Sequence, residues 1–239
     1  LANCQTEEER QRTEAVIRPI LRGKDIKRYG YDWAGLWLIY IPWHFPLQFD
    51  ETIQGASEQA EAAFMEQYPS VYAHMLQHKE PLSNRNKSET GIRYEWYAMQ
   101  RWGANYWKDF EKPKIIWKII GSRLAFTIDI NGIMVNNACY IMTGDSLMHI
   151  LGFLNSAPLI WYSEITNMNK TGVGDAQVGA QNIKLFPVPI NPNKEIERLV
   201  EQLLSNPTDD NARQLLSERI DSIYGLTKEE RHYLELLNL

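Results

Sequence analysis

The chain has 239 residues, of which 44% are hydrophobic and 23% are charged, and its formal net charge is −5. This composition excludes a disordered chain, and every apolar run falls short of the roughly 20 residues that cross a bilayer, which excludes a membrane-spanning helix. The two cysteines, Cys4 and Cys139, are too few for a disulfide scaffold, so we expect a globular protein of the cytoplasm that contacts no membrane.

The N-terminal part of the chain predicts three helices and one strand. Residues 6–9 (Thr-Glu-Glu-Glu) match a capping box, which indicates a short helix near the start of the chain. Residues 35–42 are aromatic and branched and lie between Gly and Pro, a pattern typical of a buried strand. Ser57 is suited to cap a helix that ends near Gln67, and Pro69 fits the first turn of the next helix.

The middle of the chain predicts strands. Asn131-Gly132 between two of them predicts a two-residue hairpin, because both central positions must tolerate positive φ. Asp145 is suited to cap a helix, and residues 183–190 predict an edge strand, since their prolines cannot donate to a ladder. Residues 166–182 form a loop long enough to be functional, or else a mobile connector. The other expected strands are 114–120, 124–130, 133–135 and 138–143.

The tail, residues 193–239, predicts three amphipathic helices, because its apolar residues recur at helical spacing and residues 227–230 match a second capping box. We therefore expect an α+β fold, with a twisted mixed or antiparallel sheet over residues 35–190, flanking helices and a helical C-terminal subdomain. The expected domains are 1–190 and the helical part 191–239.

Patterns that would indicate catalysis are incomplete. His74 and His78 fit one helix face, but a metal site needs three or four ligands, so a surface or structural role is favoured. Asp25-Ile26-Lys27 resembles the end of a nuclease metal motif but lacks the second carboxylate that metal-assisted phosphodiester cleavage requires. The sequence contains no nucleophile elbow and no Asn/Asp-Pro-Pro-aromatic segment. We therefore expect no catalytic residue, metal or cofactor in this chain.

Two basic stretches, 18–49 and 79–123, predict either a binding surface or ordinary solvated faces. In the first stretch, cations gather around a Gly turn between residues 18 and 29, where long side chains reach phosphates. In the second, residues 85–107 interleave cations with aromatic rings, a combination typical of phosphate contact, base stacking and cation–π packing. Most of these rings are expected to pack in the core.

A set of short motifs runs along residues 15–190. It comprises Ile17 to Tyr29, Trp37 to Ile41, Tyr68-Pro69, Leu76, Arg85, Trp96-Tyr97, Phe110 to Ile116, Leu154-Asn155-Ser156 and Leu185 to Pro189. In this order the set resembles the TaqI-like C-terminal specificity domain. That domain is the target-recognition part of adenine-N6 DNA methyltransferases, including fused type IIG restriction-modification enzymes and related phage-defence methyltransferases. The catalytic part of such enzymes and an initiator Met are both missing, so we expect a piece of a longer polypeptide.

The resemblance implies sequence-specific binding of duplex DNA, with the catalytic methyltransferase domain of the same polypeptide as partner and S-adenosylmethionine as the cofactor of that domain, which occurs with or without an endonuclease. Five cations are expected to hold DNA phosphates: Arg22, Lys24, Lys27, Arg28 and Lys114. Seven side chains are expected to read base edges: Arg85, Arg93, Arg101, Asn169, Lys170, Gln177 and Gln181. The alternatives are a protein-interaction module that uses the aromatic strip and the helical tail, and an enzyme with an unrecognised site.

Overall fold

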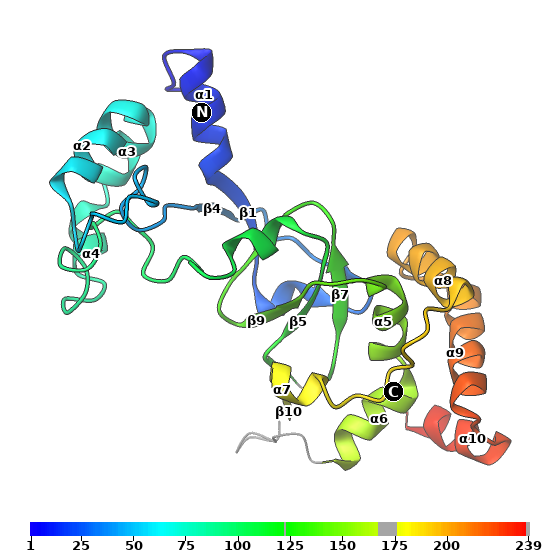
Figure 1. Cartoon of the computed structure of the whole chain (residues 1–239). Coiled ribbons are helices and arrows are strands. Elements are labelled where there is room, and N and C mark those ends of the chain that lie inside the picture. The colour runs from blue at the N-terminus through cyan, green and yellow to red at the C-terminus, as the bar shows by residue number, and fades with distance from the viewer. Residues whose placement is uncertain (122, 167–175, 238–239) are drawn as a thin grey trace. The chain divides into compact units, whose positions relative to one another are not determined.

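A computed structural model describes residues 1–121, 123–166 and 176–237 of the chain (Figure 1). The chain forms two compact units. Unit 1 comprises Leu1–Pro19 and Trp37–Trp107, and unit 2 comprises Ile20–Leu36 and Lys108–Leu239. Both units combine helices with short strands that pair mainly in antiparallel fashion, and unit 2 ends in a run of helices, so the predicted α+β class with a helical C-terminal part is confirmed.

Unit 1 contains the three predicted helices and a short fourth helix, α4, that was not predicted. Its elements are α1 (Glu7–Val16), the first part of β1 (Ile17–Leu21), β4 (Trp37–Ile39), α2 (Glu58–Gln67), α3 (Pro69–Leu76) and α4 (Lys79–Ser83). The predicted N-caps are confirmed, because the hydroxyl of Thr6 accepts from the backbone N of Glu9 and that of Ser57 from Ala60. The predicted buried strand at 35–42 is wrong in extent and burial: only three residues pair, and Trp37 is exposed.

Aromatic rings form the core of unit 1. Phe64 is fully buried, and its ring centroid lies 4.5 Å from that of Tyr97 and 5.6 Å from that of Phe45. The buried indole of Trp96 donates to the carboxylate of Glu61 at 2.7 Å, so its polar atom is satisfied inside the unit. The rings around residues 94–97 therefore belong to the core.

The main sheet of unit 2 is antiparallel and has the strand order β7-β5-β9. Ile115 of β5 lies opposite Ile128 of β7 and Met142 of β9. Shorter ladders accompany this sheet, since β8 pairs in parallel with the end of β1, β6 with β10, and β2 with β3. The strands of unit 2 are β2 (Ile26–Lys27), β3 (Gly30–Tyr31), β5 (Lys114–Lys118), β6 (Ile120–Gly121), β7 (Phe126–Asp129), β8 (Met134–Val135), β9 (Cys139–Met142) and β10 (Ala176–Gln177), and the short 3-10 helices are η1 (Gly23–Asp25) and η2 (Trp107–Glu111).

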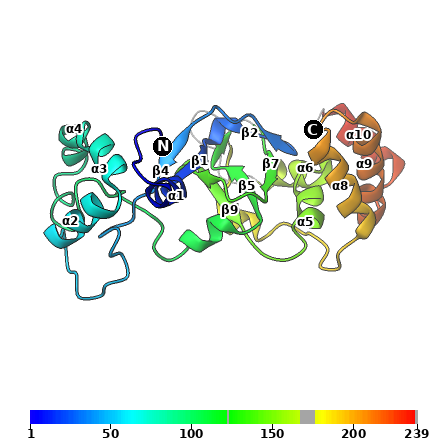
Figure 2. The same ribbon diagram turned by 90° about the horizontal axis from the view of Figure 1, so that it is seen from above.

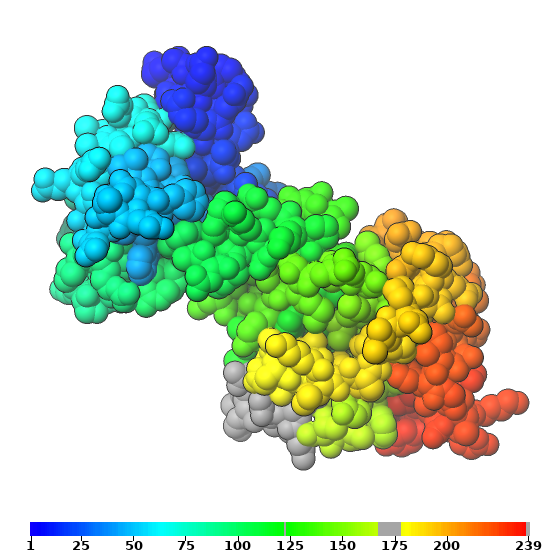
Figure 3. Space-filling model, in the orientation of Figure 1, coloured from blue at the N-terminus to red at the C-terminus, as the bar shows by residue number. Residues whose placement is uncertain are grey.

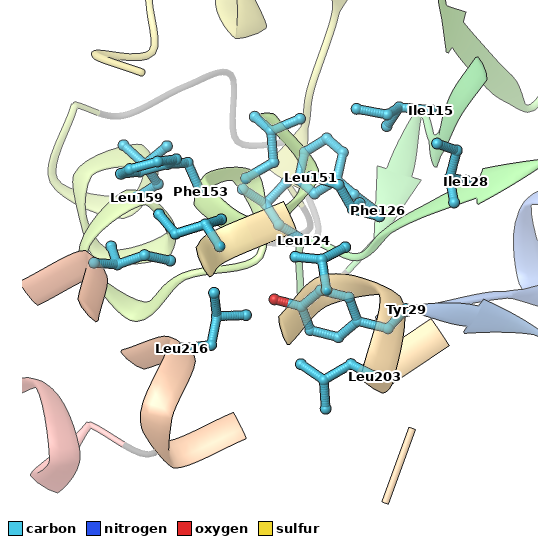
Figure 4. Packing of buried hydrophobic residues seen from close by; sticks show 14 of the residues in the cluster. Tyr29, Ile115, Leu124, Phe126, Ile128, Leu151, Phe153, Leu159, Leu203 and Leu216 are labelled. Carbon is cyan, nitrogen blue, oxygen red and sulfur yellow. The ribbon is translucent and has the colours of Figure 1, made fainter. Parts of the chain in front are cut away.

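Helix α5 packs against β7, α8 packs on α5, and α9 packs on α8 (Figures 1 and 2). Phe126 of the sheet, Leu151 of α5 and Leu203 of α8 belong to one buried cluster (Figure 4). The predicted tail helices are confirmed, and in the space-filling view the tail forms a continuous surface with the rest of unit 2 (Figure 3). The tail therefore shares its core with the sheet. The helices of unit 2 are α5 (Leu147–Leu154), α6 (Ala157–Ile165), α7 (Ala180–Ile183), α8 (Lys194–Ser205), α9 (Asp210–Tyr224) and α10 (Lys228–Leu236).

The predicted hairpin at Asn131-Gly132 is wrong. Strand β7 pairs with β5, whereas β8 pairs with β1, so the two strands on either side of the Asn-Gly pair diverge. The cause is the carboxylate of Asp129, which accepts from the backbone N–H groups of Asn131 at 3.1 Å and of Ile133 at 2.9 Å. The side chain of Asp129 thus closes the turn that a strand ladder would otherwise close.

Two further predictions of local structure also differ from the fold. Residues 183–190 contain no strand, because Ile183 ends α7 and the backbone N of Val188 bonds the carbonyl of Phe186 only two residues back. The residue that precedes α5 is Ser146, which has a φ of 56°, rather than Asp145. Helices α6 and α7 were not predicted.

Candidate nucleic-acid interface

The basic segment 22–28 begins with a turn that is braced from inside unit 2. The carboxylate of Asp25, 4% exposed, accepts from the backbone N of Arg22 and from the guanidinium of the same residue, both at 2.8 Å. These hydrogen bonds favour the charged carboxylate, so they lower the pKa of Asp25 and raise the pKa of Arg22. A Cβ atom at Gly23 would approach the carbonyl oxygen of Ala138 to 3.1 Å, so the turn sits tightly against the neighbouring backbone.

Two lysines, Lys24 and Lys27, lie at this turn with their charge in solvent. Within the described part of the chain the exposed ammonium of Lys24 has no hydrogen bond or ion pair, and Lys27, 57% exposed, lies 3.6 Å from the equally solvated Asp32. The Cβ of Lys118, at the end of β5, would lie 3.4 Å from a Cβ on Gly23, but this side chain is half-buried and its ammonium lies beside Gly121. Sequence reasoning missed Lys118, and its place at the end of a predicted strand in a basic stretch was the available signal. The turn therefore presents a cationic surface of the kind that phosphates bind.

Arg28 is built into the fold more deeply than the lysines. Its Nη2 donates to the backbone carbonyl of Asn155, at the C-terminal end of α5, where the helix dipole favours a cation. Burial lowers the pKa of Arg28, and the neighbouring cations Arg213 and Arg123 lower it further. The charges of Arg28, Arg213 and Arg123 therefore interact although these residues are far apart in sequence. Sequence reasoning missed Arg213 and Arg123.

Asn155 explains why the Leu154-Asn155-Ser156 motif matters to the fold. Its buried side-chain amide accepts from the backbone N of Phe126 at 3.0 Å and donates to the carbonyl of the same residue at 2.9 Å. Together with the bond that the backbone N of Tyr29 makes to the same carbonyl, these bonds satisfy the backbone of Phe126 in β7. The same residue offers its own carbonyl to Arg28, so Asn155 joins the basic segment to the sheet.

The structure corrects the expectation for Lys114. Its side chain is 0% exposed, and its ammonium lies 2.5 Å from Oδ2 of Asp129 and 2.7 Å from the carbonyl oxygen of Phe110. A cation without any exposed surface cannot reach a phosphate. The sequence placed Lys114 at the end of a basic stretch, where burial of a charge is rare unless it is paired. Here the partner, Asp129, stands fifteen positions further along and faces Lys114 across the ladder.

The three arginines expected to read bases all lie in unit 1. Arg93 and Arg101 both bind the carboxylate of Glu89, at 2.9 and 3.0 Å, and Arg101 is 68% exposed. These bonds lower the pKa of Glu89, and Arg101 contributes most to the change. Arg85 instead donates to backbone carbonyls, including those of Trp96 and Ala98. Arg85 thus braces the backbone of unit 1, whereas the other two form a solvated cluster.

The remaining expected base readers lie in or beside the loop 166–182. Asn169 and Lys170 fall outside the described residues. The backbone of Gln177 pairs with Ile120, and Gln181 is exposed on α7.

The described residues contain no group of three His, Cys, Asp or Glu side chains that could hold a metal ion. None of the helices in the same ranges is long and apolar enough to cross a membrane.

Unit 2 is thus an α+β domain whose cationic turn is braced by the carboxylate of Asp25 and whose tail helices share its core. Residues 18–188 match the family model of the TaqI-like C-terminal specificity domain, and the chain belongs to this family. The type II methyltransferase M.BanIII from Aneurinibacillus aneurinilyticus is 24% identical over 184 residues, which are 73% of this chain and 31% of that protein. A structure of the type IIL restriction-modification enzyme MmeI in complex with DNA covers 93% of this chain and 31% of the enzyme chain, with 17% identity and a TM-score of 0.46. The chain therefore spans about a third of the length of these relatives.

Proposed function

We propose that this chain is the target-recognition part of an adenine-N6 DNA methyltransferase or type IIG restriction-modification enzyme and that it binds duplex DNA in a sequence-specific manner. The observation that carries the proposal is the family match over residues 18–188, which takes in the cationic turn of unit 2 and the arginine cluster of unit 1. The domain division 1–190 and 191–239 remains part of this proposal, with the first part in contact with DNA.

Phosphate contacts fall to cations that keep free hydrogen-bond donors. Lys24 and Lys27 are exposed beside the braced turn. Arg22 is about one-third exposed, so its guanidinium can share a phosphate while it holds Asp25. Arg28 contributes charge close to the surface, but one of its N–H groups already donates to the Asn155 carbonyl. Such contacts set affinity and register without reading sequence.

Base readout is assigned to the most exposed polar side chains near these surfaces. Arg93 and Arg101 are exposed and have the geometry for bidentate contact with guanine once they exchange Glu89 for a base edge. Gln181 on α7 is exposed as well, and an amide of this kind pairs bidentately with adenine. Asn169, Lys170 and Gln177 remain candidates from the loop, and Arg85 joins them only if it releases the backbone carbonyls it now binds.

Methyl transfer is assigned to a catalytic domain in the rest of the polypeptide. Support comes from the relative named as a type II methyltransferase, which is about three times as long as the segment it shares with this chain. S-adenosylmethionine is expected to bind that domain, and calorimetry with this chain should give no saturable heat with the cofactor. Saturable binding would place part of the cofactor site here and contradict this division of tasks.

Burial of much of the aromatic strip argues against the alternative of a protein-interaction module. Tyr94, Trp96 and Tyr97 are all buried in unit 1, so they are not accessible to a partner. An apolar cavity of about 470 Å³ beside α6 and α10, lined by Trp161 and Tyr233 among others, remains the surface that such a partner would use. An apolar interface of this kind depends little on salt, which separates it from DNA binding.

The test is fluorescence anisotropy of labelled random-sequence duplex DNA against salt concentration. The affinity of the wild-type chain should fall steeply with salt, and Lys24→Met should reduce the magnitude of the slope of log K against log salt by about one unit or less. Lys228→Met, at an exposed position on the acidic tail, is the matched control and should leave the slope unchanged. A wild-type chain without salt-dependent binding to any duplex would overturn the proposal.

A further inference from the structure

The β2–β3 hairpin of unit 2 lies against the helical tail. A Cβ atom on Gly30 would meet Cγ of Pro207, in the connection between α8 and α9, at 3.8 Å. Tyr29, the neighbour of Gly30, and Leu203 of α8 belong to one buried cluster (Figure 4). The basic segment leads directly into this hairpin, so Arg28 at its end lies close to residues of the tail.

Arg28 has no counter-ion at this contact. Its side chain is half-buried, and its Nη2 donates to the backbone carbonyl of Asn155. Within the ranges that the structure describes, no carboxylate pairs with it. Folded proteins normally pair a charge that has lost part of its water, because desolvation of a charge costs free energy. The guanidinium of Arg28 therefore has a charge and further N–H groups to offer to an anion.

Two more arginines lie near Arg28. Burial lowers the pKa of Arg28, and the positive charges of Arg213 and Arg123 lower it further. Arg123 is exposed and stands three positions before Phe126, whose backbone bonds the side chain of Asn155. Arginines from three distant segments are thus held near one another although like charges repel. An anion that binds among them relieves this repulsion.

Arg213 lies in the first turn of α9, and its contacts leave it open to solvent. Its Nη2 donates to the carbonyl of Pro207, and its Nη1 lies 3.1 Å from Oδ1 of Asp210. The two side chains of this ion pair are 50% and 91% exposed, so the pair is weak and an incoming anion can replace Asp210. Asp210 offsets one of the three positive charges, and Asp209, the N-cap of α9, offsets a second. An excess of one positive charge remains.

The chemistry of these groups fits a phosphate. Guanidinium groups suit its oxygens because their N–H groups form paired, parallel hydrogen bonds. Lys27 lies opposite Gly30 on the β2–β3 ladder and is 57% exposed, so the arginines continue the cationic surface of the turn. A DNA strand carries a phosphate at every nucleotide, so a strand bound at the turn has further phosphates to offer to the arginines.

We propose that Arg28, Arg123 and Arg213 together bind one backbone phosphate of the DNA, so that the acidic helical tail takes part in DNA binding through Arg213. The inference rests on the proposed function, because the phosphate belongs to the duplex bound at the cationic turn. It extends the expected contact with DNA beyond residue 190.

The first test is fluorescence anisotropy of random-sequence duplex DNA against salt concentration, with the full chain carrying Arg213→Met. Loss of one phosphate contact should weaken binding by roughly threefold to tenfold at low salt and reduce the magnitude of the salt slope by about one unit or less. Arg219→Met is the matched control, because Arg219 lies on the same helix, is 42% exposed and also holds one carboxylate, that of Glu195 at 3.0 Å. The control removes the same charge and should leave affinity and slope close to those of wild type.

Two outcomes of this test would overturn the phosphate site. Equal losses in the two variants would show that only the net charge of the tail matters. Salt-dependent binding by wild type that Arg213→Met does not change would remove the site and leave the proposed function standing. Should Arg213→Met fail to fold by circular dichroism, Arg123→Met, at another exposed position, replaces it with the same expected loss.

The second test uses inorganic phosphate as the probe and needs no DNA. Phosphate should raise the thermal midpoint of wild type and of Arg219→Met by more than that of Arg213→Met, with chloride at equal ionic strength as the reference, because a ligand that binds only the folded chain stabilises it. Equal shifts in all three chains overturn the site whether or not a duplex binds. Stabilisation by phosphate that Arg213→Met abolishes, with unchanged DNA affinity, identifies a site for free phosphate only and contradicts the proposal.

Discussion

Replacing Lys114 by Met should destabilise the fold without altering phosphate contact. In the folded chain its ammonium is fully buried between Asp129 and the Phe110 carbonyl. Removal of one partner of a buried ion pair leaves an uncompensated charge and costs about 3–5 kcal/mol. Asp129 still accepts from the backbone N–H groups of Asn131 and Ile133, which stabilise its charge, so we expect a loss near the lower limit, about 3 kcal/mol.

The assay is urea unfolding followed by far-ultraviolet circular dichroism. With a urea dependence of about 2 kcal/mol per molar, a loss of 3 kcal/mol lowers the midpoint by roughly 1.5 M. Lys24→Met, at an exposed site, should change the free energy of unfolding by less than about 0.5 kcal/mol. The double variant Lys114→Met with Asp129→Asn should be more stable than the sum of the single changes predicts, because no charge is then left buried.

The two variants should have the opposite order of effect on DNA binding from the one they have on stability. Lys24→Met should lower the salt slope and Lys114→Met, assayed where it is folded, should not. A Lys114→Met chain of wild-type stability, with a salt slope reduced by about one unit, would show that this lysine reaches phosphate and would refute the reasoning from its burial.

Three further predictions follow from contacts at the turn and the sheet. Gly23→Ala should cost about 1–3 kcal/mol by overpacking against the Ala138 carbonyl, whereas Gly30→Ala, whose Cβ would meet Pro207 at an ordinary 3.8 Å, should be close to neutral; equal urea midpoints would contradict this. The pKa of Asp25 is lowered in the folded state, so its stabilisation is complete above the unfolded value of about 3.9 and is lost as the pH falls through the folded pKa. Unfolding of wild type should therefore become easier below pH 4 by more than that of Asp25→Asn, and parallel pH profiles would argue against the pair. Asn155→Ala should cost about 1–3 kcal/mol because it removes the acceptor of the buried Phe126 N–H, whereas the Phe126 carbonyl still accepts from the backbone N of Tyr29, and a calorimetric loss well below 1 kcal/mol would contradict this role.

The helices could be predicted because their signals are local. Thr6, Ser57 and Thr227 each cap a helix through bonds within four residues, and the tail helices repeat apolar residues along one face. Such patterns need no knowledge of distant partners. The strands between residues 114 and 143 were located, but those at 17–21, 26–31 and 176–177 were not predicted, and the pairing of the strands was not predicted either. Asn131-Gly132 fits a hairpin locally, but the Asp129 carboxylate closes the turn and β7 and β8 pair with other strands.

The candidate interface could be predicted in part, because a cation's role depends on which acceptors lie near it. Lys24 and Lys27 sit on an exposed turn, as their setting in a Gly-containing basic segment suggested. Arg213 comes near Arg28 only through the packing of the tail. Spacing along the chain does not predict such contacts, because they join residues that are far apart in sequence.

The basic residues differ in the acceptors that their N–H groups already bind in the folded chain. Arg85 and Arg28 donate to backbone carbonyls, and Lys114 pairs with a buried carboxylate. Much of the positive charge in the two basic stretches therefore stabilises the fold. Lys24 and Lys27 are the main exceptions, because they are hydrated and bind no buried acceptor. A phosphate can therefore replace their water without leaving a buried group unpaired. The salt dependence of DNA binding should therefore be smaller than a count of basic residues indicates, because only cations that exchange water for phosphate release counterions from DNA.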